Sequence, residues 1–149
     1  MNRTITLNMN KKRTLGQLIK YAIVGCMNTI LTLGVIFVCK SLLGVNEYVS
    51  NGIGYVVGII NSFLWNRSWV FNSRDGHMRS QAVRFLAGFF ICYAIQLLIV
   101  WLINKSWFGE TQYNILGFVL SGYGVATLIG NVAYTLCNFI YNKIFTFKK

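Results

Sequence analysis

The sequence predicts an all-α, polytopic membrane protein whose four transmembrane helices form two tandem two-helix repeats. Three observations support this prediction. Hydrophobic residues make up 55% of the 149 residues and charged residues only 11%, whereas soluble domains carry about 25% charged residues. The charges are segregated from four apolar stretches, each long enough to cross the ~30 Å hydrocarbon core of a bilayer as a helix. The two halves of the chain also share a pattern of aromatic, asparagine and basic residues.

The four predicted spans follow a polar tail at residues 1–16. Each span is built around a run of residues without charge, and the fourth lies in the longest such run. Proline is absent from the sequence, so no span is expected to carry a proline kink. The spans cover about 18–42, 47–67, 83–104 and 115–143.

The basic residues predict how the chain lies in the membrane. With four spans, both ends and the central loop share one side, which holds twelve lysines and arginines against two on the other side. Positive residues gather on the cytoplasmic side of membrane proteins, so both termini are expected on the cytoplasmic face of the cell membrane. Topology and anionic lipid account for the net charge of +11. We expect no nucleic-acid partner, because the sequence has no motif for one.

An internal repeat divides the chain into two halves. The first span opens with Lys20-Tyr21 and the third with Arg84-Phe85, 64 positions later. The second span ends in WNRSWVF (65–71) and the fourth in YNKIFTF (141–147), 76 positions later. Because each half holds two spans, both halves are predicted to keep the same orientation, related by an axis along the membrane normal.

Small residues recur every four positions along the second and fourth spans. Such stripes let helix backbones approach closely where lipid provides no hydrophobic drive. We expect them to pack helices together and also to join copies of the chain in a homo-oligomer. A substrate groove lined by these residues is the alternative. They are Ser50, Gly54, Gly58, Gly122, Ala126 and Gly130.

A polar face follows the fourth span, with spacings of four, four, three and four residues that keep the side chains on one side of a helix. Asparagine without a partner is costly in hydrocarbon, so this face is expected to meet protein or water. Two interpretations remain open: hydrogen bonds between helices, or a hydrated path for a polar headgroup. The residues are Thr127, Asn131, Thr135, Asn138 and Asn142.

One basic residue stands at the inner end of each predicted span. In a bundle these ends converge, so the four cations are candidates for binding a phosphate, with Asn66 and Asn142 as neutral donors beside them. The alternative is that each cation reaches ordinary lipid phosphates at the membrane surface. The four cations are Lys20, Arg67, Arg84 and Lys143.

The sequence argues against several other classes of function. No charge lies deep in a predicted span, whereas a proton-coupled pump or a small four-span drug exporter needs an acidic residue there. No GxxxxGK[ST] loop, catalytic constellation or cluster of metal ligands occurs, so we expect neither an enzyme nor a cofactor. The four cysteines lie in apolar stretches and are expected to pack as small apolar residues.

Four motifs occur in a fixed order between residues 15 and 148: Lys20-Tyr21, NSFLWNRSWVF (61–71), Arg84-Phe85 and NFIYNKIFTF (138–147). This ordered set resembles the GtrA-like family of small four-span membrane proteins. The family often places asparagine directly before phenylalanine at the end of the second span. Here Ser62 holds that place and Asn61 precedes it, so the resemblance transfers this role to Asn61.

The resemblance implies a role in the synthesis of cell-surface polysaccharides. Such proteins are thought to flip an undecaprenyl-phosphate-linked sugar to the outer leaflet, where a separate membrane glycosyltransferase adds the sugar to a polymer such as O-antigen or teichoic acid. The alternative is a non-transporting subunit that anchors or positions that glycosyltransferase. Together with the residue pattern, this assigns phosphate binding to the four inner cations and headgroup contacts to Asn61, Asn66, Asn131, Asn138 and Asn142.

Overall fold

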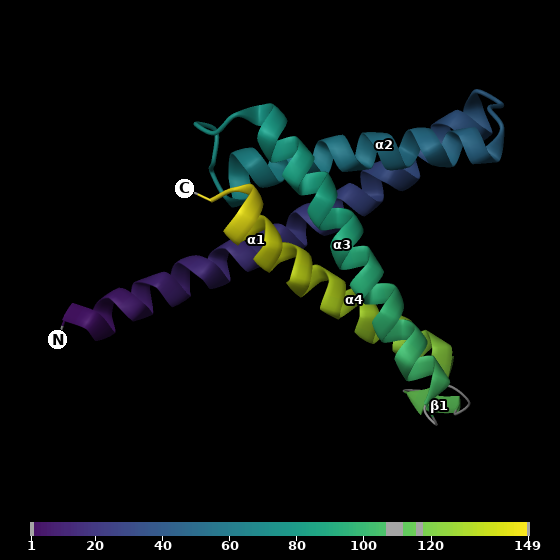
Figure 1. The fold of residues 1–149 in the computed structure, drawn as a ribbon. Coiled ribbons are helices and arrows are strands. Elements are labelled where there is room, and N and C mark those ends of the chain that lie inside the picture. Colours follow the sequence, from purple (N-terminus) through teal and green to yellow (C-terminus); the bar gives the residue numbers. More distant parts are fainter. Residues whose placement is uncertain (1, 107–111, 116–117, 149) are drawn as a thin grey trace. The chain divides into compact units, whose positions relative to one another are not determined.

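The structure, a computed structural model, describes residues 2–106, 112–115 and 118–148 (Figure 1). In this part of the chain, single π-helical turns extend three of the four α-helices. The α-helices are α1 (Asn2–Phe37), α2 (Glu47–Trp65), α3 (Met78–Lys105) and α4 (Gly122–Tyr141). The π turns are η1 (Val38–Leu42), η2 (Asn66–Val70) and η4 (Asn142–Thr146), and the two strands are β1 (Gln112–Ile115) and β2 (Phe118–Ser121).

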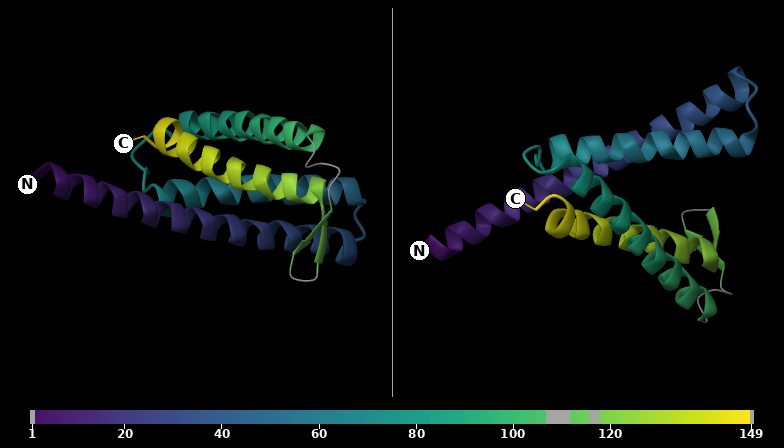
Figure 2. Two further views of the ribbon diagram at one scale, coloured as in Figure 1. Left: turned by 90° about the horizontal axis from the view of Figure 1, so that it is seen from below. Right: turned by 45° about the horizontal axis from the view of Figure 1, so that its top comes forward.

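The chain folds as two compact units with a boundary between His77 and Met78. Each unit is a helical hairpin. In the first, α2 runs back along α1, and in the second, α4 runs back along α3 (Figures 1 and 2). The boundary falls between the two halves of the sequence repeat, so the predicted two-helix repeats correspond to the two folded units.

Three helical segments among the described residues are long and apolar enough to cross a membrane: Lys12–Leu42, Met78–Lys105 and Gly122–Thr146. Many of their large apolar side chains are exposed, as expected of surfaces that meet lipid. These findings confirm a polytopic all-α membrane fold. The α2 helix is not among the three, because its glycine, asparagine and serine residues lower its hydropathy. A fourth span at α2 therefore stays a prediction.

Small residues bring α2 close to α1. Ser50, Gly54 and Gly58 are all buried. A Cβ atom added at Gly54 would lie 2.5 Å from the Ile36 side chain and 3.1 Å from the Thr32 carbonyl oxygen. These distances leave no room for a methyl group, so glycine is what allows the two backbones to approach.

The same packing recurs in the second unit. A Cβ atom at Gly130 would lie 2.6 Å from the Val100 side chain and 3.3 Å from that of Gln96, and Val100 and Gln96 are the repeat equivalents of Ile36 and Thr32. The predicted packing role of the small residues is thus confirmed. The expectation that the same stripes also join copies of the chain in a homo-oligomer stays a prediction.

The helix boundaries differ from the sequence predictions at two places. The α1 helix begins at Asn2, so residues 2–16 of the predicted tail, 1–16, are part of the first helix. The fourth helix begins at Gly122 and not near 115, because strands β1 and β2 pair there in antiparallel register, with Gln112 opposite Ser121. Aromatic and β-branched residues favour extended backbone, and a short apolar run does not distinguish a strand from a helix. Ser121 then caps α4 by accepting a hydrogen bond from the Gly124 N–H at 3.2 Å.

Candidate functional site

The ends of α2 and α4 carry matching π-helical turns. The carbonyl oxygen of Asn66 accepts a hydrogen bond from the Phe71 N–H at 3.0 Å, and that of Asn142 accepts from the Phe147 N–H at 2.8 Å. Both bonds reach five residues along the chain, whereas an α-helix reaches four. Such π turns are rare and often mark functional positions. They place Asn66 and Asn142, two of the predicted site residues, at the same point of each unit.

Both of these asparagines are buried, with 1% of Asn66 and 0% of Asn142 exposed. Asn66 Nδ2 donates to the Ser62 carbonyl oxygen at 2.8 Å, and Asn142 Nδ2 donates to Asn138 Oδ1 at 3.0 Å. Within the described part of the chain, neither Oδ1 atom has a hydrogen-bond partner. A buried acceptor without a partner costs about 1–3 kcal/mol, so each amide keeps the capacity to accept a further donor.

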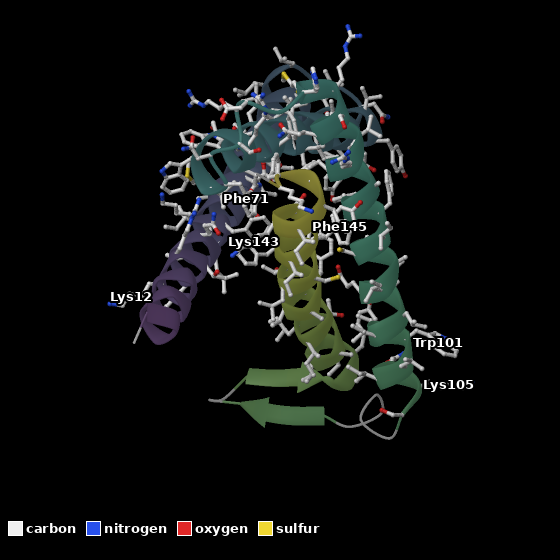
Figure 3. The ribbon with its side chains drawn as sticks, turned by 60° about the vertical axis from the view of Figure 1, so that its left-hand side comes forward. Lys12, Phe71, Trp101, Lys105, Lys143 and Phe145 are labelled. Atoms are coloured by element: carbon white, nitrogen blue, oxygen red, sulfur yellow. The ribbon has the colours of Figure 1, made fainter. Side chains whose placement is uncertain are left out.

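An aromatic pair joins the two helices at the same end of each unit. The rings of Tyr21 and Phe71 lie 6.3 Å apart at 60°, and those of Phe85 and Phe147 lie 6.3 Å apart at 54°. Pairs of this kind contribute about 0.5–1.5 kcal/mol beyond their burial. They hold the end of η2 against α1, where Figure 3 labels Phe71, and the end of η4 against α3. The end of each hairpin that carries η2 or η4 is therefore fixed by equivalent contacts.

The two predicted phosphate-binding cations of the first unit have defined contacts. Lys20 Nζ lies 5.2 Å from the centre of the Trp69 ring. Arg67 Nη2 donates to the carbonyl oxygens of Arg74, at 2.6 Å, and Gly76, at 3.0 Å, which ties η2 to the loop that follows it. Both cations remain partly exposed, so an anion can still approach them.

The two predicted cations of the second unit lie at the corresponding helix ends. Arg84 Nη1 donates to the Phe145 carbonyl oxygen at 3.2 Å, and Lys143 Nζ lies 5.8 Å from the centre of the Phe139 ring. Figure 3 shows Lys143 and Phe145 at the end of this hairpin that is opposite to Lys105. Each unit thus has one pair of the predicted cations at the same end of its hairpin. The ring of all four draws on both units and stays a prediction.

Polar side chains also meet between the helices of the second unit. Gln96 Nε2 on α3 donates to Asn131 Oδ1 on α4 at 2.7 Å. Within α4 itself, Asn138 Nδ2 donates to the Tyr134 hydroxyl at 3.2 Å. Hydrogen bonding between helices, one of the two interpretations of the polar face, is therefore observed at Asn131. That side chain remains exposed, and the second interpretation, a hydrated path, stays a prediction.

In the first unit, Asn61 contacts the facing helix. Its Nδ2 atom donates to Asn28 Oδ1 at 3.4 Å. The equivalent positions of the second unit are Cys92 and Cys137, whose sulfur atoms lie 3.3 Å apart. Both cysteines are free thiols. The same pair of repeat positions therefore forms a contact between helices in both units. Amide groups form it in the first unit and thiols form it in the second.

A cleft of about 250 Å³ lies in the first unit, between α1 and the end of η2. Within it, the buried Gln17 Oε1 atom has no hydrogen-bond partner in the described part of the chain. Sequence reasoning missed Gln17, although Gln17 precedes Lys20 by three residues just as Gln81 precedes Arg84, so the repeat register could have identified it. The lining residues are Arg13, Gly16, Gln17, Lys20, Trp69, Val70, Phe71 and Asn72.

These features define a polytopic helical membrane protein built from two similar hairpins with basic and amide side chains at matching helix ends. The chain belongs to the family described as the GtrA/DPMS transmembrane domain, which it matches over residues 20–147. The matched range includes the four inner cations and the equivalent π turns η2 and η4. The family resemblance seen in the sequence is thereby confirmed.

The chain is also similar to a protein of Bacillus subtilis (strain 168), the uncharacterized membrane protein YngA. The two are 29% identical over 149 residues, which cover 97% of this chain and 86% of the relative. The similarity thus extends along nearly the whole of both chains, and the printed name describes the relative as a membrane protein.

Proposed function

We propose that the protein flips a polyprenyl-phosphate-linked sugar from the inner to the outer leaflet of the cytoplasmic membrane, for glycosylation of a cell-surface polysaccharide or teichoic acid. The observation that carries this proposal is the pair of equivalent helix ends, each with a buried asparagine at a π turn and a basic residue directly after it. Membership of the GtrA/DPMS family supports a role in membrane-bound glycosylation.

The three parts of a lipid-linked sugar need different surroundings, and the chain offers a match for each. The polyprenyl tail stays in the bilayer, against the exposed apolar side chains of the helices. The phosphate needs cations, which stand at the inner end of each hairpin as Lys20 with Arg67 and as Arg84 with Lys143. Because positive residues gather inside, the basic ends face the leaflet in which the lipid-linked sugar is made.

The sugar needs hydrogen-bond partners while it crosses the bilayer. Amide side chains continue inward from the π turns, as Asn66 and Asn61 on one hairpin and as Asn142, Asn138 and Asn131 on the other. Sugar hydroxyl groups that pass along this route exchange hydrogen bonds to water for hydrogen bonds to amides. They therefore avoid the cost of several kcal/mol that an unpaired polar group has in hydrocarbon. Transport then follows the gradient of the lipid-linked sugar, because a membrane glycosyltransferase consumes it outside.

Transport can be measured with purified protein in liposomes that contain a labelled polyprenyl-phosphate hexose. Periodate, which does not cross the membrane, oxidises only the sugars exposed on the outer face. Wild-type protein is expected to make the inner pool accessible, and Arg67→Ala to slow this process. Arg74→Ala is the matched control, because Arg74 receives a hydrogen bond through its backbone carbonyl only and its side chain lies in the exposed loop.

The outcomes separate the proposal from its alternative. Wild-type liposomes that expose no more sugar than protein-free liposomes would contradict flipping. If the same protein then co-purifies tightly with a membrane glycosyltransferase, the anchoring subunit is the better description. Equal rates for wild-type, Arg67→Ala and Arg74→Ala proteins would place the phosphate contact away from the inner end of η2.

A further inference from the structure

We propose that the phosphate of the transported lipid is loaded in one unit only, in the cleft of the first unit, with Lys20 and Arg13 as its contacts. The inference rests on the proposed function and deepens it, because it assigns one loading site to each chain and a ligand class to that site. The ligand is a lipid phosphate diester that carries hydroxyl groups, as a glycosyl phosphate does.

The cleft residues on α1 form a single face. Arg13, Gln17 and Lys20 follow each other at spacings of four and three residues, which places them on one side of a helix within two turns. All three line the cleft. Its volume of about 250 Å³ is roughly eight times the ~30 Å³ that one water molecule occupies in the liquid. A phosphate with part of an attached ring therefore fits between the two cations.

The two cations contribute in different ways. The Arg13 guanidinium can bind two phosphate oxygens at once through parallel N–H donors. The Lys20 ammonium is held 5.2 Å from the centre of the Trp69 ring, a cation–π contact that fixes its position without using its N–H donors. The aromatic wall of the cleft thus positions a cation that remains able to donate to an anion.

Gln17 is the reason that the proposed ligand carries hydroxyl groups in addition to its phosphate. Its Oε1 atom is a buried acceptor without a partner among the described residues, and such an acceptor is satisfied by a donor group. A phosphate diester has no donor at neutral pH, and a phosphate monoester, whose second pKa is about 6, is mostly without one, whereas a sugar hydroxyl is a donor. Gln17 is therefore expected to distinguish a sugar-bearing lipid phosphate from a bare polyprenyl phosphate.

The second unit does not repeat this arrangement. In the register of the repeat, His77 occupies the position that corresponds to Arg13. An imidazole therefore replaces the permanently charged guanidinium. The Arg84 guanidinium, which corresponds to Lys20, donates to the Phe145 carbonyl oxygen at 3.2 Å. Gln81, which corresponds to Gln17, is 6% exposed and already has an interaction partner. The equivalent groups of the second unit are thus already engaged in other interactions.

The test is native mass spectrometry of the full-length protein, titrated with a polyprenyl-phosphate hexose. Wild-type protein is expected to bind one lipid per chain. Lys20→Met and Arg13→Gln should each weaken binding about tenfold, the usual effect of losing a charge-assisted hydrogen bond, and Lys20→Arg should retain it. Lys105→Met is the matched control, because Lys105 also lies over a tryptophan, 5.0 Å from the Trp101 ring, but at the other helix end. Its affinity should be unchanged.

Further comparisons decide between one site and two. Arg84→Met should weaken binding less than Lys20→Met does. Two lipids bound per chain, or equal losses for these two variants, would overturn the assignment to the first unit. A wild-type protein that binds with the expected pattern but exposes no sugar in liposomes would leave the cleft assigned and refute flipping. A wild-type protein that transports the sugar but does not show this binding pattern would support flipping and refute the assignment of the cleft.

Competing lipids identify the source of the phosphate. Gln17→Leu should weaken binding of the sugar-bearing lipid and leave that of bare polyprenyl phosphate unchanged, and equal effects on both would refute the role of Gln17. Phosphatidylglycerol offers a phosphate diester with hydroxyl groups from ordinary membrane lipid. If it binds as tightly as the polyprenyl-phosphate hexose, the assignment to a lipid-linked sugar is overturned.

Discussion

The sulfur atoms of Cys92 on α3 and Cys137 on α4 lie 3.3 Å apart. A disulfide needs them at about 2.05 Å, so a small adjustment of the side chains is sufficient. We predict that air oxidation catalysed by copper phenanthroline in native membranes joins these two thiols, with the two electrons passing to oxygen. After denaturation, a maleimide reagent should modify two of the four cysteines, Cys26 and Cys39, and all four after reduction.

A Cys137→Ala variant provides the control for this experiment. It should leave three cysteines open to the reagent whether or not the membranes were oxidised. Four cysteines modified in the oxidised wild-type protein would contradict the packing of α3 on α4 described above. Replacing Asn28 and Asn61 by cysteine in a background without native cysteines should create the equivalent cross-link in the first unit, where the two amides lie 3.4 Å apart.

A second prediction compares two glycines of α2. Gly54→Ala should lower the free energy of unfolding by about 1–3 kcal/mol, because the new methyl group would overlap Ile36 and the Thr32 carbonyl. Gly52→Ala is the matched control, since nothing lies within 4 Å of a Cβ atom at that position and alanine is the better helix former. Thermal unfolding in detergent measures both changes. A loss of equal size at Gly52 would argue against close packing of α2 on α1 through Gly54.

A third prediction separates the structural role of a buried asparagine from its functional role. Asn66→Leu keeps the approximate shape and removes an unpartnered acceptor along with the two hydrogen bonds from Asn66 Nδ2 to Ser62, so stability should change by less than about 1 kcal/mol. Transport in liposomes should nevertheless fall. Asn66→Asp should instead lower stability by about 3–5 kcal/mol, the cost of an uncompensated buried charge. Full transport by a stable Asn66→Leu protein would remove Asn66 from the proposed route.

The number of spans and their direction can be tested together. Leu43 lies directly after η1 and Arg74 lies after η2, and both are exposed. Each can be replaced by cysteine, as Leu43→Cys and Arg74→Cys, in a protein without its native cysteines. If α2 crosses the membrane and the positive-inside prediction holds, an impermeant maleimide should label Leu43→Cys in intact cells and Arg74→Cys only after permeabilisation. Labelling of both variants from the same side would show that α2 does not cross, and a reversed pattern would invert the proposed orientation.

The sequence was sufficient to predict features that follow from apolar length and from the repeat. The segments predicted near 18–42, 47–67 and 83–104 lie within α1 with η1, α2 with η2, and α3, and a membrane span at 47–67 stays a prediction. Gly54 and Gly130 pack as predicted because small side chains at four-residue spacing have one main use in a helix that lies against another. The repeat register also placed Asn66 and Asn142 at equivalent points of the two hairpins.

Other features depend on tertiary contacts that no local pattern reports. A π turn differs from an α-helix by one hydrogen-bond partner, so the composition around Asn66 does not reveal it. The β1–β2 pair has the apolar character of a helix end, which led to the wrong start near 115. Gln17 was overlooked because its meaning comes from the cleft formed with Trp69, a residue 52 positions later.

The π turns η2 and η4 also belong to the internal repeat. A π turn holds one more residue than an α-helical turn, and both hairpins have it at the same place, at Asn66 and Asn142. One insertion in an ancestral hairpin, before the gene was duplicated, accounts for both turns. The spacing between equivalent residues grows from 64 in α3 to 76 in α4, and these 12 additional residues (76 − 64) coincide with the β1–β2 segment. The two hairpins therefore differ in length mainly in the connection between their helices.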